Sequence, residues 1–243
     1  MKYKILVPIY KNDLSVNEML SLRNVTDVYG KSEIVLFSPK RLKPGNEISK
    51  YDIQKFEDNF FKDVMSYNRL MLSKEFYERF CHYDYILIHQ LDAFIFKKQL
   101  KKWCEKGYDY IGAPWLKSNK LFSNIFKSKK LKKREPIFNN VGNGGFSLRK
   151  VSTFLKFFEN HENVIQDHRG DDLYKIEDVF WSLIAPKYMD FNIPDYKEAV
   201  FFSIDRKPDI GMRLTNGELP FGCHGFEKSK TKKFWKKYIK GLK

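Results

Sequence analysis

Short apolar runs alternate with amphipathic segments in the first half of the chain. Residues 4–10, 33–38 and 85–89 are nearly continuous runs of aliphatic and aromatic side chains, a pattern typical of strands covered on both faces. Apolar residues at helical spacing lie between them, in residues 14–24 and 56–80. This alternation predicts an α/β domain with a mixed, mainly parallel sheet flanked by helices.

The second half continues the pattern, with more glycine. Further strands are expected at 108–115 and 198–204, and further helices at 100–106, 150–160 and 176–184. The glycine-rich stretch between them holds Asn143, Gly144 and Gly145, which permit positive φ and a close backbone approach to a ligand. The same glycines also fit a plain hairpin or bulge.

Polar residues interrupt the apolar pattern at three places that suit a binding site. Asp92 follows the strand at 85–89, where ligands bind in open α/β sheets, although an Asp there can equally cap a turn. Glu177 and Asp178 begin a helix, a position that also suits acids because they complement the helix dipole. His224 lies between glycines in a loop, where a single His is more often structural than a ligand.

The composition narrows the class of protein. The 243 residues fit one large α/β domain or two small ones, and a single domain is expected. No Gly-x-Gly-x-x-Gly follows the first strand and no Walker A loop occurs, which disfavours dinucleotide dehydrogenases and P-loop enzymes. The three cysteines have neither zinc nor disulfide spacing. Without a signal peptide or a membrane-spanning apolar window, the protein is expected to be cytoplasmic.

The net charge of +15 comes from two segments. Residues 117–134 contain eight basic residues and no acid, and are expected to form a mobile loop or a weak amphipathic helix. Residues 227–243 contain eight lysines and one Glu. This tail predicts either a basic amphipathic helix at an anionic membrane surface or a helix packed on its own domain. Nucleic acid is not expected as a partner, because no nucleic-acid-binding motif occurs. The apolar stripe of the tail consists of Phe234, Trp235, Tyr238, Ile239 and Leu242.

Four blocks in order, QLDAF, GNGGFSLR, EDVFW and GCHGF, resemble a family of bacterial proteins first described as a domain of unknown function. They are more distantly similar to the fringe and β-1,3-galactosyltransferase group of GT-A glycosyltransferases. The resemblance covers roughly residues 7–226. It implies a GT-A-like domain at 1–226, with a nucleotide-binding half at 1–116 and an acceptor-side half at 135–226, followed by the tail.

The resemblance implies a glycosyltransferase. The enzyme would move a sugar from a nucleoside-diphosphate donor, with UDP expected, to a cell-surface glycan or lipid-linked acceptor at the inner face of the plasma membrane. Asp92 and His224 would bind Mn²⁺ or Mg²⁺. Gln90 stands where the Asp-x-Asp motif has its first Asp, so the site has one negative charge fewer. Asp178 would act as the base of an inverting reaction, with Glu177 beside it.

The resemblance also assigns donor contacts. Pro8 and Tyr10 would line the nucleobase pocket, and Tyr67 and Arg69 would contact the nucleotide, since Arg suits a diphosphate. The Asn143-Gly144-Gly145 segment would let a sugar approach the backbone. Trp115 and Trp181 are candidates for stacking on sugars, and Trp181 is equally expected in the core.

Two other functions remain open. A non-catalytic carbohydrate- or membrane-binding protein on a degenerate glycosyltransferase fold is supported by Gln90. A nucleotidyltransferase is less favoured, because residues 8–15 provide no glycine-rich activating loop.

Overall fold

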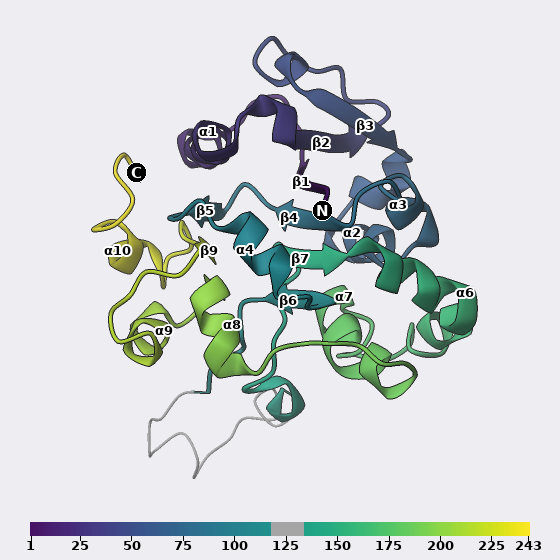
Figure 1. The fold of residues 1–243 in the computed structure, drawn as a ribbon. Helices are drawn as coiled ribbons and strands as arrows, with labels where there is room; N and C mark the ends of the chain where they lie inside the picture. The colour runs from purple at the N-terminus through teal and green to yellow at the C-terminus, as the bar shows by residue number, and fades with distance from the viewer. Residues whose placement is uncertain (118–133) are drawn as a thin grey trace.

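The computed structural model describes residues 1–117 and 134–243. A six-stranded sheet in the order β3-β2-β1-β4-β7-β6 forms the centre of the molecule (Figure 1). Strands β3, β2, β1 and β4 are parallel, and β7 runs antiparallel to both β4 and β6. The predicted mixed, mainly parallel sheet is confirmed. Its strands are β1 (Tyr3–Pro8), β2 (Ile34–Pro39), β3 (Asp52–Phe56), β4 (Tyr85–His89), β6 (Tyr110–Gly112) and β7 (Phe146–Lys150).

A small second sheet lies beyond the end of β4. It has the order β5-β9-β8, with β5 antiparallel and β8 parallel to β9. Because β5 follows β4 after a short turn, this sheet joins the C-terminal part of the chain to the end of the central sheet. Its strands are β5 (Ala93–Ile95), β8 (Ser203–Ile204) and β9 (Gly222–His224).

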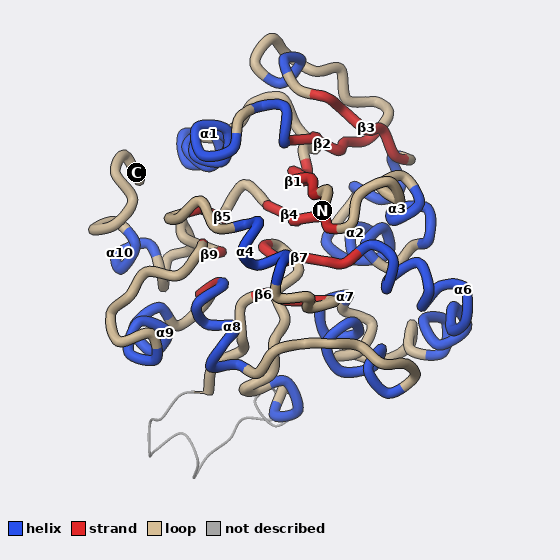
Figure 2. Tube along the Cα trace, in the orientation of Figure 1, coloured by secondary structure: helices blue, strands red, loops and turns tan. Residues whose placement is uncertain are grey.

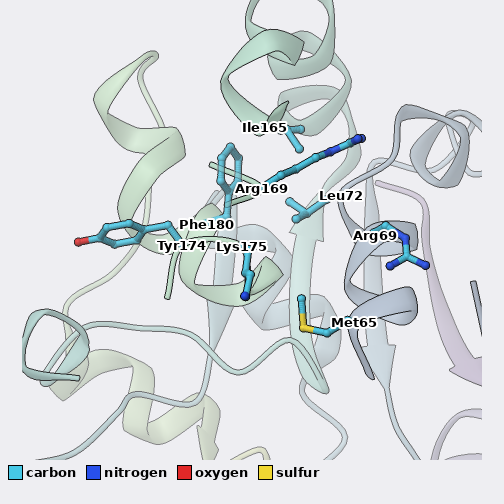
Figure 3. A pocket seen from close by; sticks show the side chains of 8 residues that line it. All are labelled: Met65, Arg69, Leu72, Ile165, Arg169, Tyr174, Lys175 and Phe180. Atoms are coloured by element: carbon cyan, nitrogen blue, oxygen red, sulfur yellow. The ribbon is translucent and has the colours of Figure 1, made fainter. Parts of the chain in front are cut away.

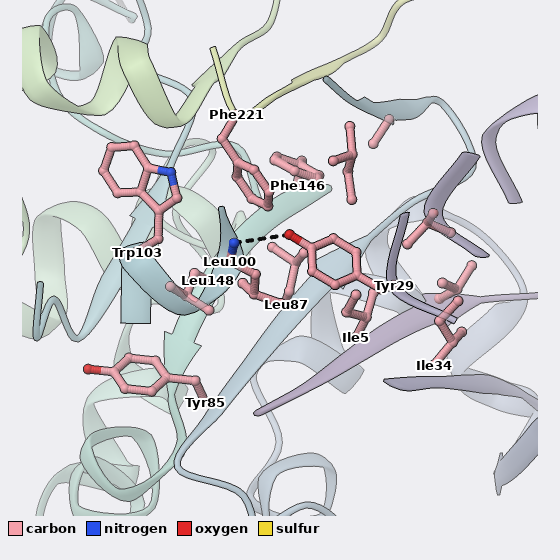
Figure 4. Close-up of a cluster of buried hydrophobic side chains, with 14 of the residues drawn as sticks. Ile5, Tyr29, Ile34, Tyr85, Leu87, Leu100, Trp103, Phe146, Leu148 and Phe221 are labelled. Carbon is pink, nitrogen blue, oxygen red and sulfur yellow. Dashed lines mark hydrogen bonds between the residues drawn. The ribbon is translucent and has the colours of Figure 1, made fainter. Parts of the chain in front are cut away.

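Helices cover both faces of the central sheet (Figure 2). On one face, α1, α4 and α8 bury residues such as Leu22, Trp103 and Phe202 against the strands. The Tyr29 hydroxyl accepts a hydrogen bond from the Leu100 backbone at 3.0 Å inside this cluster (Figure 4). The helices of this face are α1 (Val16–Tyr29), α4 (Leu100–Glu105) and α8 (Tyr196–Phe202).

The opposite face is covered by an aromatic cluster. Tyr77 stacks on Phe154, and Trp181 packs beside them in contact with both rings. Residues 180–184 form a π-helical turn that continues α7 and directs Trp181 into this core. The helices of this face are α2 (Val64–Met71), α3 (Lys74–Glu78), α6 (Val151–Asp167) and α7 (Glu177–Val179).

The structure corrects two predicted elements. Residues 56–80 do not form one helix, because the Asp63 and Ser73 side chains accept backbone hydrogen bonds and start the separate helices α2 and α3. The strand predicted at 198–204 is mostly helix α8, which the Asp195 side chain caps through two backbone N–H groups. An apolar run of this length fits either element, and the local cap decides.

The C-terminal tail packs on the domain itself. It contains the short helix α10 (Lys232–Trp235), beside α9 (Pro208–Leu214). Trp235, Ile239 and Leu242 are buried, and Trp235 stacks on Phe96. These three residues anchor the tail to the domain, whereas Phe234 and Tyr238 are half-buried and most of the lysines face solvent. The basic segment predicted at 117–134 lies almost wholly outside the described residues. Across the described parts of the chain, no helix has the length and apolar character needed to cross a membrane.

Candidate active site

Asp92 and His224 lie in contact at the carboxyl end of β4. Asp92 occupies the turn between β4 and β5, and His224 ends β9. Strands β5 and β9 pair with Ala93 opposite His224. This pairing places Nε2 of His224 2.9 Å from Oδ1 of Asp92. The small sheet thus brings together two predicted metal ligands that are far apart in sequence.

Two residues that were not predicted complete the cluster. Lys228 Nζ is 3.2 Å from Asp92 Oδ2, and Asp205 Oδ1 is 3.3 Å from His224 Nδ1. Burial alone would raise the pKa of Asp92, but the charges of His224 and Lys228 hold it well below its usual range. Burial would lower the pKa of His224, yet Asp92 and Asp205 raise it to about 9. Lys228 follows His224 by four residues and could have been found in the sequence, whereas Asp205 gave no signal.

A divalent metal has three possible protein ligands here. Gln90 Oε1 lies 3.3 Å from His224 Nε2, so an amide oxygen and an Asp92 carboxylate oxygen both lie at the same imidazole nitrogen. In the described part of the chain, no group of three or more His, Cys, Asp or Glu side chains is placed to hold a metal. The set therefore fits a metal only if Gln90 contributes its oxygen. Asp205 would orient the imidazole from behind, as carboxylates do in many His–metal sites.

The glycine-rich segment forms the wall of this cluster. A Cβ on Gly145 would lie 2.3 Å from His224 Nε2 and 2.5 Å from Gln90 Oε1. A Cβ on Gly144 would lie 1.5 Å from Glu177 Oε1. Asn143 has a φ of 65° and places its side-chain nitrogen 3.0 Å from His224 Nδ1. Both positions require glycine, because a Cβ at either would clash with the side chains packed against the segment. A plain hairpin would not impose this requirement.

Glu177 is held in a buried ion pair. Its carboxylate lies 3.1 Å from Arg149 Nη2, and its backbone N–H donates to Asn68 Oδ1 at 2.9 Å. Arg149 is fully buried and also donates to the Tyr77 hydroxyl at 2.8 Å. Burial raises the pKa of Glu177, and the Arg149 guanidinium opposes that rise. Glu177 is thus held by Arg149 and Asn68 inside the protein. The sequence did not predict these contacts.

Asp178 differs from its neighbour. Its Oδ2 accepts a long hydrogen bond from the Gly144 backbone at 3.4 Å, and its Oδ1 is buried without a partner in the described chain. Burial raises the pKa of Asp178. A group with these properties is a suitable proton acceptor.

Asp178 lines a cavity of about 540 Å³. Trp115 and Asp205 line the same cavity, and Asp205 connects it to the Asp92–His224 cluster. Trp115 remains a candidate for stacking on a sugar. Trp181 does not, because it is fully buried and donates its indole N–H to the Met71 carbonyl. Four basic residues, Arg134, Arg206, Lys207 and Lys230, lie on the cavity wall.

The predicted donor contacts fall into two groups. Pro8 ends β1 beside β4, and Tyr10 is 58% exposed. Burial and the Glu18 carboxylate raise the pKa of Tyr10, with a smaller contribution from Asp92. Burial raises the pKa of the Tyr67 hydroxyl, and the Gln90 side chain opposes that rise. Arg69 instead lines a separate pocket.

Residues 50–224 match a family described as "Protein of unknown function (DUF5672)". The match covers more than half of the chain. The chain belongs to this family. The DUF5672 region includes Gln90, Asp92, Asp178 and His224 but ends before Lys228. None of the curated proteins matches the sequence.

Solved structures show the fold of the chain. Mouse xyloside xylosyltransferase 1 matches with a TM-score of 0.56 and 12% identity, over 95% of this chain and 99% of that one. Galactosyltransferase LgtC, in complex with donor and acceptor sugar analogs, matches with a TM-score of 0.55 and 11% identity, over 93% and 88% of the two chains. These neighbours are GT-A glycosyltransferases, so this DUF5672 protein has a GT-A-like fold.

Proposed function

We propose that the protein is a glycosyltransferase that uses a nucleoside-diphosphate sugar, with UDP as the expected nucleotide. The main support is the adjacency of two features. A cluster of Gln90, Asp92, His224 and Lys228 suits a diphosphate and a metal, and it adjoins a cavity lined by the Asp178 carboxylate, which has no ion-pair partner among the described residues. A transferase needs both features, because the leaving diphosphate must be neutralised and the attacking hydroxyl must lose its proton.

The donor would lie along the carboxyl end of the sheet. Tyr10 and Pro8 would contact the nucleobase, and Tyr67 would lie near the ribose and diphosphate. Lys228 would neutralise phosphate oxygens, a role that its ion pair with Asp92 places it to take. When Mn²⁺ or Mg²⁺ is bound, it adds positive charge that stabilises the leaving group. Gln90, Asp92 and His224 would hold it.

Asp178 would be the catalytic base. Its carboxylate would accept the proton of an acceptor hydroxyl as the hydroxyl oxygen bonds to the anomeric carbon and the bond to the diphosphate breaks. Attack opposite the leaving group would invert the anomeric centre. Glu177 would act by positioning, because its ion pair with Arg149 fixes the start of α7 and the neighbouring Gly144. Trp115 would stack on a sugar ring in the same cavity.

The Asp178→Asn variant tests this assignment. We expect it to bind UDP like the wild type but to transfer sugar about 10²–10⁴-fold more slowly, since a positioned base contributes about that much. UDP binding is measured by calorimetry with and without Mn²⁺, with Asp92→Ala as the comparison. Retained transfer in Asp178→Asn contradicts the base assignment. UDP affinity that neither Mn²⁺ nor Asp92→Ala changes contradicts the metal site.

A non-catalytic sugar-binding protein is the second candidate. Gln90 favours it, because the site has one carboxylate fewer than an Asp-x-Asp site. Slow hydrolysis of a UDP-sugar without acceptor separates the two, since a pure binding protein shows none.

The acceptor would be a glycan or lipid-linked sugar at an anionic membrane surface. Most lysines of the tail face solvent while Trp235, Ile239 and Leu242 are buried, so binding would be electrostatic and would not require insertion. Co-sedimentation with anionic vesicles should decrease with salt and with a Lys236→Glu/Lys237→Glu variant. Binding that persists at high salt contradicts this.

A further inference from the structure

A second pocket lies away from Asp178, where three segments meet. Helix α2 contributes Met65, Arg69 and Leu72, which share one helical face, and the end of α6 contributes Ile165. Arg169 follows α6 and reaches across the pocket, as Figure 3 shows. The remaining lining residues are Tyr174, Lys175 and Phe180.

The charge of this pocket is positive and largely uncompensated. It is lined by three basic residues and no acidic one. Arg69 donates to the neutral Ser66 hydroxyl at 2.9 Å. Lys175 lies 3.8 Å from the exposed Asp172, a separation at which a surface ion pair contributes little. Arg169 makes no side-chain ion pair with the described residues. An anion that enters the pocket would therefore meet basic side chains and no acidic one.

The floor of the pocket is apolar. Phe180 and Ile165 are almost fully buried, and Leu72 lies beside them. The cavity is about 200 Å³, whereas sites for drug-sized ligands span roughly 300–1,000 Å³. A single small unit therefore fits, with one apolar face and one anionic group. A sugar ring with a carboxylate or phosphate has these features, because its C–H face packs on aromatic side chains.

The pocket shares a wall with the Asp178 cavity. Ile176 and Val179 line the cavity, whereas Lys175 and Phe180, from the same segment, line the pocket. Helix α2 touches the segment again, because Asn68 accepts the Glu177 backbone N–H. A ligand in the pocket would contact the elements that hold Asp178.

We propose that this pocket is a second binding site, which takes an acidic sugar unit of the glycan. The ring packs on Phe180 and Leu72, and Arg69, Arg169 and Lys175 bind the carboxylate or phosphate. This assigns Arg69 to the acidic sugar and not to the donor diphosphate. The inference rests on the proposed function for the identity of the ligand, but the site itself can be tested without turnover.

The test uses the full chain and three probes: glucuronic acid, glucose 6-phosphate and neutral glucose. Binding is followed by NMR of the Ile165 methyl groups, with Ile210 on α9 as a distant reference. We expect one or both acidic sugars to shift Ile165 and not Ile210, and glucose to shift neither. Arg169→Ala should weaken that binding about tenfold or more. The matched control, Arg213→Ala, removes another exposed Arg, from α9, and should leave acidic-sugar binding unchanged.

The two acidic probes distinguish a carboxylate from a phosphate ligand. Equal binding of glucose, or binding that Arg169→Ala leaves intact, overturns the proposal. Inorganic phosphate that binds as tightly as glucose 6-phosphate also overturns it, because the ring would then contribute nothing. UDP titrations on the same samples keep the two proposals apart. UDP binding without acidic-sugar binding rejects only the second site, and the reverse result rejects only the donor site.

Discussion

The imidazole Nε2 of His224 lies 2.9 Å from Oδ1 of Asp92, and the Lys228 ammonium lies on the other carboxylate oxygen. One carboxylate thus meets two cationic groups before any ligand is present. Asp205, on the far side of the imidazole, completes an alternation of negative and positive charge. Such an arrangement favours the protonated form of His224, and a metal held at Nε2 would have to displace that proton.

The His224 pKa gives the first prediction. Asp92 and Asp205 raise it from 6.5 to about 9, so the pairing stabilises the fold fully below about pH 6.5 and is lost as pH rises through about 9. The contribution is on the order of 3 kcal/mol. NMR titration of the His224 ring in EDTA should show the raised pKa, and Asp92→Asn should lower it. A wild-type pKa near 6.5 contradicts the prediction.

The second prediction concerns the buried ion pair between Arg149 and Glu177. Glu177→Ala leaves a buried guanidinium without its carboxylate, which should lower the free energy of unfolding by about 3–5 kcal/mol. Glu75→Ala, which breaks the exposed pair with Arg79, should cost less than about 1 kcal/mol. Urea unfolding measures both. A Glu177→Ala protein that is as stable as the wild type but inactive would place Glu177 on the substrate.

Gly145 gives the third prediction. A methyl group there would overlap His224 Nε2 and Gln90 Oε1, so Gly145→Ala should displace both side chains. We expect UDP–Mn²⁺ affinity to fall by about 10–100-fold, as for other changes that misplace metal ligands. Gly170→Ala is the matched control, because its Cβ would meet no atom within 4 Å. Calorimetry measures the UDP–Mn²⁺ affinity of both variants. If the two substitutions lower that affinity equally, the cluster is not the nucleotide site.

The fourth prediction concerns the packing of the C-terminal tail on the domain. Trp235 is fully buried beside Phe96, and the Asn17 side chain holds the backbone of Lys243 at 3.1 Å. Trp235→Ala should therefore destabilise the domain by about 3–5 kcal/mol. Lys236→Ala, on the exposed side, should change stability by less than about 0.5 kcal/mol. If Trp235 fluorescence shifts on addition of anionic vesicles while the domain stays folded, the tail leaves the domain at a membrane.

The sequence by itself determined the buried strands β1, β2 and β4 and the order of the site blocks. Val7, Leu36 and Leu87 lie in apolar runs that can only be buried, and the carboxyl ends of such strands meet at one edge. That local logic placed Asp92 just after the carboxyl end of β4, and left open whether it caps a turn or binds a ligand. Helix caps such as Ser15 with Glu18 are likewise local, since each partner lies within one turn.

Only the tertiary structure decided how neighbouring residues divide their roles. Glu177 and Asp178 are adjacent acids at the start of one helix, and only the resemblance distinguished them by implying that Asp178 is the base; in the structure α7 turns Glu177 onto Arg149, whereas Asp178 lines a cavity. The same holds for Trp235, whose stripe fits a membrane or a domain surface equally well. These outcomes depend on which distant side chains arrive at the same place, and no pattern of spacing along the chain encodes that.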